Sequence, residues 1–462
     1  MKIYCLTFLA TIAVTFHAGA GFAADYPLKP VSYNDVEMTS NFWRPRMITQ
    51  RETLVPWAFE RTEPGVAHLQ AAADFQKGKA VEDHRAHRFI DSDLYKVMEG
   101  AAYLLQLERN PDLEARMDKI IAVIGEAQEP SGYLYPSHTT RLGTEKNMMG
   151  DKPYSFVVHS HELYNMGHLY EAAVAYYETT GKDALLKIAE KNAQHINKVF
   201  FEGDPDYNGG KPIRQAPGHQ EPELALVKLY RVTGNELYLE MERKFLEVRG
   251  VTYVPDGEGV MSPTYAQQHK PVLKQSQAVS HAVRATYLYS AMADMAALTG
   301  EKGYAEALDR IWGDITNTRM HITGGLGAVH GIEGFGPQYE LPNAHAFNET
   351  CAAVGNVFFN HRMFLLHKDA RLLEVAEVAL LYLEGLAGLH LSVPDEKLTI
   401  RPALPEAWDW MEFRLPIKNQ WTKVRYTKDD VEVSGSPFTV DRGPNCCVTR
   451  RSRSPLNCRE TF

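Results

Sequence analysis

The sequence lacks an excess of positive charge. It carries 49 Lys and Arg residues against 58 Asp and Glu residues, and its formal net charge is -9 at pH 7. A mildly acidic chain has no electrostatic reason to bind nucleic acid or an anionic membrane surface, so neither partner is expected. Neutral and weakly polar ligands, sugars among them, stay open.

Beyond its first residues, the sequence also lacks any apolar run long enough to cross a membrane. Near the start, Lys2 precedes an apolar stretch at 3–16, and small residues follow at 18–23. This order predicts a signal peptide over residues 1–23, and therefore a secreted or periplasmic protein. A membrane anchor is the weaker alternative, because the run is shorter than the roughly 20 residues that span a bilayer.

Cysteines are few. The sequence has five, and Cys5 would leave with the signal peptide, so that Cys351, Cys446, Cys447 and Cys458 remain. An even number in an exported protein usually suggests disulfides. Adjacent cysteines seldom bond to each other, however, because a vicinal disulfide strains the backbone. A metal site is the alternative use for these thiols.

The largest part of the chain has a helical pattern. Apolar residues recur at helical spacing from about residue 92 to residue 391, for example over 94–105, 169–177 and 288–296. This segment therefore predicts a mostly α-helical fold.

Turns divide these helices at regular intervals. Turn signals stand at positions 110, 180, 233, 299 and 367, so that successive turns are separated by 53 to 70 residues. Each interval fits one helical hairpin and a connecting loop, and is longer than the common solenoid repeats of roughly 34 to 47 residues. The spacing favours an (α/α) toroid whose inner helices face an axial cavity. A superhelical solenoid is the alternative.

The character of the sequence changes after Leu391. The predicted organisation is a barrel-forming catalytic domain over 24–391, a small β module over 392–440 and a basic, disordered tail over 441–462. Short β-branched or alternating segments lie at 397–400, 411–415 and 422–426, between Pro and Gly turns. The tail carries five Arg residues and few apolar residues.

Two acidic positions stand out for their chemistry. Glu349 and Cys351 open a predicted helix, where a carboxylate and a thiol form a reasonable zinc ligand pair and the helix N-terminus lowers a thiol pKa. Packing and helix capping are the alternatives. Glu333 lies in a Gly-flanked loop beside Phe335, which could raise its pKa as a glycosidase acid requires. An exposed loop glutamate is the alternative there.

Three histidines recur in the same relation to the helical repeats. His168, His219 and His281 each stand at or near a predicted helix start. In a toroid these starts could line one mouth of the cavity, where imidazoles can form hydrogen bonds with sugar hydroxyls. Purely structural histidines are the alternative.

Six motifs occur in order along the chain. They are NFWRPR at 41–46, HELYNMGH at 161–168, GHQE at 218–221, AVSHAVR at 278–284, TGGLG at 323–327 and ETC at 349–351. The ordered set, over roughly residues 28 to 390, resembles glycoside hydrolase family 127 and its relative family 146, the β-L-arabinofuranosidases.

The resemblance implies an (α/α)6 barrel, one zinc ion and retaining hydrolysis of an arabinofuranoside-containing glycan. It implies that Glu333 is the general acid/base and that His168, His219 and His281 contact the sugar. The implied zinc ligands are Glu349, Cys351, Cys446 and Cys447, with Cys446 as the nucleophile.

The chain departs from this family at the adjacent cysteines. In the family a Cys-Cys pair is followed by Pro-Pro-Asn and precedes sizeable β domains, whereas Cys446 and Cys447 are followed by Val-Thr-Arg within the basic tail. Either the tail folds back to the site, or the nucleophile is absent. The alternatives to a zinc-dependent glycosidase are a non-catalytic carbohydrate-binding remnant and an (α/α)6 glycosidase or lyase that acts without zinc.

Overall fold

The computed structural model of the protein describes residues 25–32, 36, 43–82, 86–142, 146–380, 389–392, 397–400, 410–417, 420–427 and 431–441. The predicted signal peptide, Cys446, Cys447 and the basic tail after residue 441 lie outside the described residues.

The described chain is mostly helical. The longer helices are α1 (Trp43–Thr49), α2 (Val55–Arg61), α3 (Glu63–Gln76), α4 (Ile90–Leu107), α5 (Pro111–Ala127), α8 (Glu162–Thr180), α9 (Ala184–Asn197), α10 (Pro222–Thr233), α11 (Glu236–Val248), α12 (Ala282–Thr299), α13 (Lys302–Asp314), α14 (Thr350–His367) and α15 (Ala370–Leu380). Two short helices, α6 (Pro136–Thr139) and α7 (Lys146–Met149), lie in the loop between α5 and α8.

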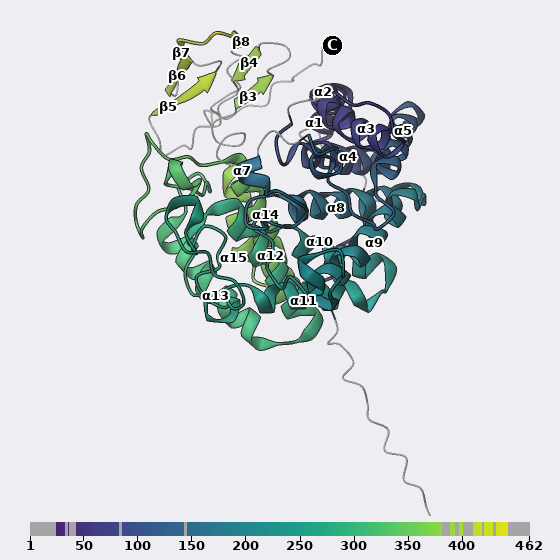
Figure 1. The fold of residues 1–462 in the computed structure, drawn as a ribbon. Coiled ribbons are helices and arrows are strands. Elements are labelled where there is room, and N and C mark those ends of the chain that lie inside the picture. Colours follow the sequence, from purple (N-terminus) through teal and green to yellow (C-terminus); the bar gives the residue numbers. More distant parts are fainter. Residues whose placement is uncertain are drawn as a thin grey trace, which may run out of the picture.

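Alternate helices form an inner layer. α4 packs on α8, α8 on α10, α10 on α12 and α12 on α14, while α9, α11, α13 and α15 each pack against the preceding inner helix (Figure 1). The burial of the helices agrees with these two layers. Every residue of α12 from Ala282 to Leu298 is buried, whereas α9, α11 and α13 each bury only part of their residues. A helix buried on all sides belongs inside the barrel, and an amphipathic helix belongs outside it.

The predicted Thr-Gly turns end the inner helices. α8, α10 and α12 end at Thr180, Thr233 and Thr299, and the glycine that follows each has a positive φ of 73°, 69° and 68° respectively. Glycine adopts this left-handed conformation without the steric penalty of a Cβ atom, and the N–H of each glycine closes the last helical turn. The hairpin spacing predicted from the sequence is therefore confirmed.

A short β region follows the helices. It contains β3 (Leu389–Ser392), β4 (Lys397–Ile400), β5 (Trp410–Ile417), β6 (Gln420–Thr427), β7 (Val431–Ser434) and β8 (Thr439–Asp441). The strand orders are β3-β4-β8, with β4 and β8 parallel, and β5-β6-β7, which is antiparallel throughout. The predicted strands at 397–400, 411–415 and 422–426 fall within β4, β5 and β6.

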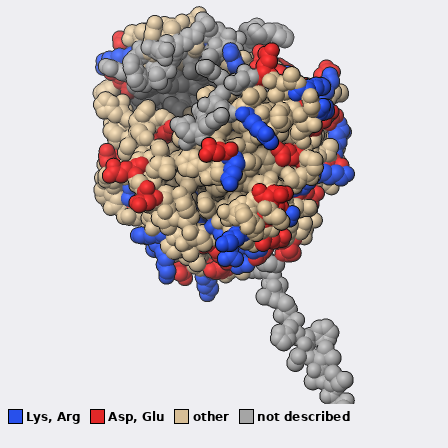
Figure 2. Space-filling view, viewed as in Figure 1, with Lys and Arg blue, Asp and Glu red and all other residues tan. Residues whose placement is uncertain are grey.

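The surface shows no large field of one sign on the face drawn in Figure 2, where acidic and basic side chains are interspersed. None of the described helices combines the length and apolar character that a bilayer crossing needs.

Candidate active site

A two-stranded pairing between distant loops builds the site. β1 (Ser280–His281) pairs antiparallel with β2 (Gly334–Phe335), and His281 lies opposite Gly334. A Cβ atom on Gly334 would lie 1.9 Å from the Ser280 carbonyl oxygen, so only glycine permits this approach. The pairing places Glu333, the residue just before β2, beside the first residues of α12.

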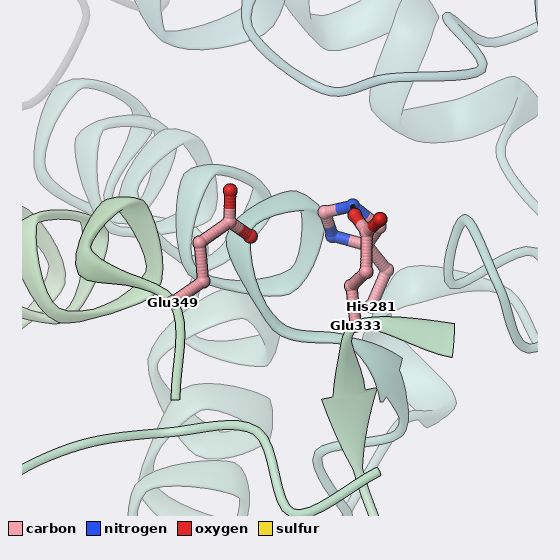
Figure 3. A group of neighbouring side chains, drawn as sticks. All are labelled: His281, Glu333 and Glu349. Atoms are coloured by element: carbon pink, nitrogen blue, oxygen red, sulfur yellow. Dashed lines mark ion pairs between the residues drawn. The ribbon is translucent and has the colours of Figure 1, made fainter. Parts of the chain in front are cut away.

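Glu333 and His281 lie within hydrogen-bond distance of each other. His281 Nε2 lies 3.1 Å from Glu333 Oε2. A carboxylate oxygen of Glu349, at the start of α14, joins them: one polar atom from each of the three residues lies within 4.8 Å of the other two (Figure 3). The structure thus brings together two carboxylates and an imidazole that are separated by 16 to 68 positions in the sequence.

The prediction that the loop raises the pKa of Glu333 is wrong. The hydrogen bond from His281 lowers the pKa of Glu333, and this effect outweighs the opposing effect of partial burial. Burial lowers the pKa of His281 to about 4. At neutral pH the imidazole is therefore uncharged, and its Nε2–H donates to an ionised Glu333 carboxylate. The Arg284 backbone N–H points to His281 Nδ1 at 3.4 Å, as this tautomer requires.

The pKa values of Glu349 and Cys351 are shifted upward, in the direction opposite to that of Glu333. Burial raises the pKa of Glu349 above its ordinary value. Cys351 is exposed as a whole residue, but partial desolvation of its thiol, followed by the charge of Glu349, raises the thiol pKa. The expectation that the start of α14 lowers this thiol pKa is therefore wrong, because the adjacent carboxylate and desolvation dominate.

Glu349 and Cys351 offer an oxygen and a sulfur atom that could bind zinc. Glu349 Oε2 is buried and has no hydrogen-bond donor among the described residues. A carboxylate oxygen and a sulfur are both ordinary zinc ligands, and a bound cation would satisfy this oxygen and favour the thiolate. The donor chemistry of Glu349 and Cys351 therefore fits zinc. Cys446 and Cys447, the other two predicted ligands, lie outside the described residues.

Two of the three predicted histidines lie together. The ring centroids of His219 and His281 are 5.4 Å apart. Tyr164 separates His168 from these two histidines. The centroid of the Tyr164 ring is 4.1 Å from that of His219 and 4.6 Å from that of His168. His168 is the seventh residue of α8 rather than a residue at its start, and its Nδ1 lies 3.3 Å from Glu221 Oε1. His168 therefore lies in the first half of α8, about two turns from its start.

The sequence analysis missed His161. This residue directly precedes α8 with a left-handed φ of 60°, and its ring centroid lies 5.6 Å from that of His219. His161, His219 and His281 thus form a continuous row of imidazoles. A signal for it was present, because His161 directly precedes α8 just as His281 directly precedes α12.

Fold and site together define a helical-barrel protein with two nearby carboxylates, a row of imidazoles and a thiol at the ends of its inner helices. The chain belongs to glycoside hydrolase family 127: residues 35–395 match the family model described as β-L-arabinofuranosidase, GH127 catalytic domain. Residues 391–441 separately match the C-terminal domain of glycosyl hydrolase family 65.

Known proteins resemble the chain in both sequence and structure. It is 33% identical over 393 residues to a non-reducing end β-L-arabinofuranosidase of Bifidobacterium longum subsp. longum, and the match covers 77% of this chain but 57% of that protein. A GH127 β-arabinofuranosidase structure superposes with a TM-score of 0.70 at 34% identity, covering 88% of this chain and 68% of the other. A GH127 β-L-arabinofuranosidase from Geobacillus stearothermophilus T6 gives 0.68 at 29% identity, covering 88% and 74%. The predicted (α/α)6 barrel and the family-127 resemblance are confirmed.

Proposed function

We propose that the protein is a retaining exo-glycosidase that removes β-L-arabinofuranosyl units from the ends of glycans. The observation that carries the proposal is the approach of Glu333, Glu349 and His281 to within 4.8 Å of one another. Retaining cleavage needs a carboxyl group that acts as general acid and then as general base, and a nucleophile close to it. The similarity to arabinofuranosidases of family 127 supports the choice of sugar.

Glu333 serves as the general acid/base in this proposal. In the ligand-free arrangement its carboxylate accepts the His281 hydrogen bond, which is the form that can take a proton from the hydrolytic water. The acid step needs a protonated Glu333. If a sugar hydroxyl takes the His281 N–H, the interaction that lowers the Glu333 pKa is lost, and the carboxyl can then carry the proton to the leaving oxygen.

His219 and His281, with His161 beside them, hold the sugar by hydrogen bonds in this proposal. His168 contributes through Tyr164, which separates its ring from that of His219.

Glu349, Cys351, Cys446 and Cys447 are the proposed zinc ligands, with Cys446 as the nucleophile. Zinc keeps a bound thiol deprotonated at neutral pH. This matters here because the surroundings of Cys351 otherwise favour the protonated thiol.

A second candidate is a glycosidase that works with two carboxylates and without zinc. The pKa of Glu333 is lowered, which favours its ionised form, and the pKa of Glu349 is raised, which favours its protonated form. Such enzymes use one carboxyl group in each form. An oxygen of each carboxylate lies within 4.8 Å of the other, which is compatible with the roughly 5 Å between the carboxyl groups of retaining enzymes. In this candidate Glu349 is the acid and Glu333 the nucleophile.

The test is the release of 4-nitrophenol from 4-nitrophenyl β-L-arabinofuranoside, together with the zinc content of the purified protein. We expect about one zinc per chain and a fall in kcat of about 10²- to 10⁴-fold in Glu333→Gln. Cys446→Ser should be equally inactive. Cys458→Ser, in the same tail, is the matched control and should retain activity.

Other outcomes separate the alternatives. Activity that survives in Cys446→Ser but is lost in Glu349→Gln would favour the two-carboxylate enzyme. A wild-type protein that folds and binds arabinofuranosides without cleaving them would be a carbohydrate-binding remnant. We also propose export through the segment at 1–23, which the N-terminal sequence of the protein recovered from the producing cells would test.

A further inference from the structure

Ser137, His68 and Asp91 form a hydrogen-bonded chain outside the site described above. Ser137 Oγ lies 3.2 Å from His68 Nε2, and His68 Nδ1 lies 2.9 Å from Asp91 Oδ1. The three residues come from α6, α3 and α4, and all are buried, with exposed fractions of 4%, 3% and 2%. Residues 69 positions apart in the sequence thus meet in a single line of contacts.

The carboxylate fixes the direction of these hydrogen bonds. A carboxylate oxygen accepts hydrogen bonds, so His68 Nδ1 donates to Asp91 Oδ1 and His68 Nε2 is left as an acceptor. The Ser137 hydroxyl therefore donates to His68 Nε2. This is the order serine, histidine, aspartate in which an imidazole can remove the serine proton and a carboxylate stabilises the resulting cation.

Ser137 also lines a cavity. The cavity has a volume of about 390 Å³, and its described wall residues include Ser137, His138, Arg141, Asp151 and Lys152. This volume lies within the range of small-molecule sites. Arg141 and Lys152 place two positive charges in this wall, which favour negative charge that develops on a bound group. Glu333, Glu349 and His281 do not line this cavity.

We propose that Ser137, His68 and Asp91 form a second hydrolytic site, which cleaves small carboxylic esters of alcohols or sugar hydroxyls. Ser137 Oγ bonds to the ester carbonyl carbon while His68 Nε2 takes the hydroxyl proton. The ester C–O bond then breaks, and His68 returns the proton to the departing alcohol oxygen. Water attacks the acyl-serine with His68 again as the base, which releases the carboxylic acid and restores Ser137. One ester and one water thus give one acid and one alcohol.

The experiment uses the whole protein with two probes. 4-Nitrophenyl acetate measures ester turnover, and a fluorophosphonate, which modifies activated serines, is located by peptide mass spectrometry. We expect labelling at Ser137 and a loss of turnover of at least about 100-fold in Ser137→Ala and in Asp91→Asn, whose shape is preserved. Ser131→Ala removes an exposed serine nearby and is the matched control, which should label and turn over as the wild type does.

The alternative is a purely structural role, in which these hydrogen bonds stabilise the packing of α6 on α3. In that case Ser137→Ala would lower the melting temperature, but wild-type turnover would equal that of the variant and Ser137 would stay unlabelled, which overturns the proposal. Labelling at another residue would also overturn it. Cleavage of 4-nitrophenyl β-L-arabinofuranoside is measured on the same samples and should stay within about twofold in Ser137→Ala. A loss of ester hydrolysis can therefore be distinguished from a loss of glycosidase activity.

Discussion

Glu242 provides a quantitative test of the electrostatics inside the barrel. The residue lies on α11 and is wholly buried, and neither of its carboxylate oxygens meets a hydrogen-bond donor among the residues that the structure describes. Burial, followed by the negative charge of Asp294, raises the pKa of Glu242 well above its ordinary value. The folded protein therefore holds a proton at this position that the unfolded chain releases.

The effect of Glu242→Gln follows from this difference in pKa. Because the folded pKa is the higher one, the contribution of Glu242 to stability is most favourable below about pH 4.5 and becomes less favourable as the pH rises toward the folded pKa. At about 1.4 kcal/mol per pKa unit, the loss at pH 7 is at most roughly 3.5 kcal/mol. Glutamine does not ionise, so the variant should recover up to that amount. For a chain of 462 residues this corresponds to a rise in Tm of at most about 4 °C.

The measurement is thermal unfolding followed by circular dichroism at about pH 4.5, 6 and 7.5. Glu240→Gln is the matched control on the same helix, because Glu240 is partly exposed and its hydrogen bond from Arg243 lowers its pKa. Its removal should cost well under about 1 kcal/mol, since solvent screens the pair. The reasoning fails if Glu242→Gln melts no higher than the wild type at pH 7.5, or if its gain is the same at pH 4.5.

Three further changes test the packing and the site. Gly218→Ala would place a Cβ atom 1.9 Å from the Val158 carbonyl oxygen, so we expect a loss of about 3 kcal/mol or more in urea unfolding and a loss of the proposed arabinofuranosidase activity. Gly100→Ala, in α4, meets nothing within 4 Å and should instead add about 0.5–1 kcal/mol; a loss would contradict the packing described. His281→Phe removes the hydrogen bond that lowers the Glu333 pKa. Because Glu333 must be protonated to act as the acid, the alkaline limb of the kcat/KM profile should move to higher pH, and an unmoved limb would refute the role of that bond.

Local sequence patterns were sufficient to predict the helical hairpins and the strands that follow them. Helical periodicity and Thr-Gly turns each involve residues within a few positions of one another, so the backbone geometry that they favour can be inferred without knowing the rest of the fold. The turns after α8, α10 and α12 accordingly lie where the pattern places them. The ordered motifs likewise predicted the family, since each motif is a short contiguous segment.

Contacts between distant segments decided the chemistry of the site. Glu333 has a lowered pKa because β1 and β2 bring His281 to its carboxylate, although its Gly-rich loop alone suggested the opposite. Ring positions likewise place His161, rather than His168, next to His219.

The sequence by itself determined the helical class, the hairpin spacing and the family of this protein, because these properties depend on local backbone preference and on contiguous motifs. The tertiary structure alone decided which groups share protons. The protonation of Glu333, and the alignment of Ser137 with His68 and Asp91, depend on distances of about 3 Å between residues that the chain keeps far apart. Charge interactions and desolvation act through space, and only the folded barrel sets those distances.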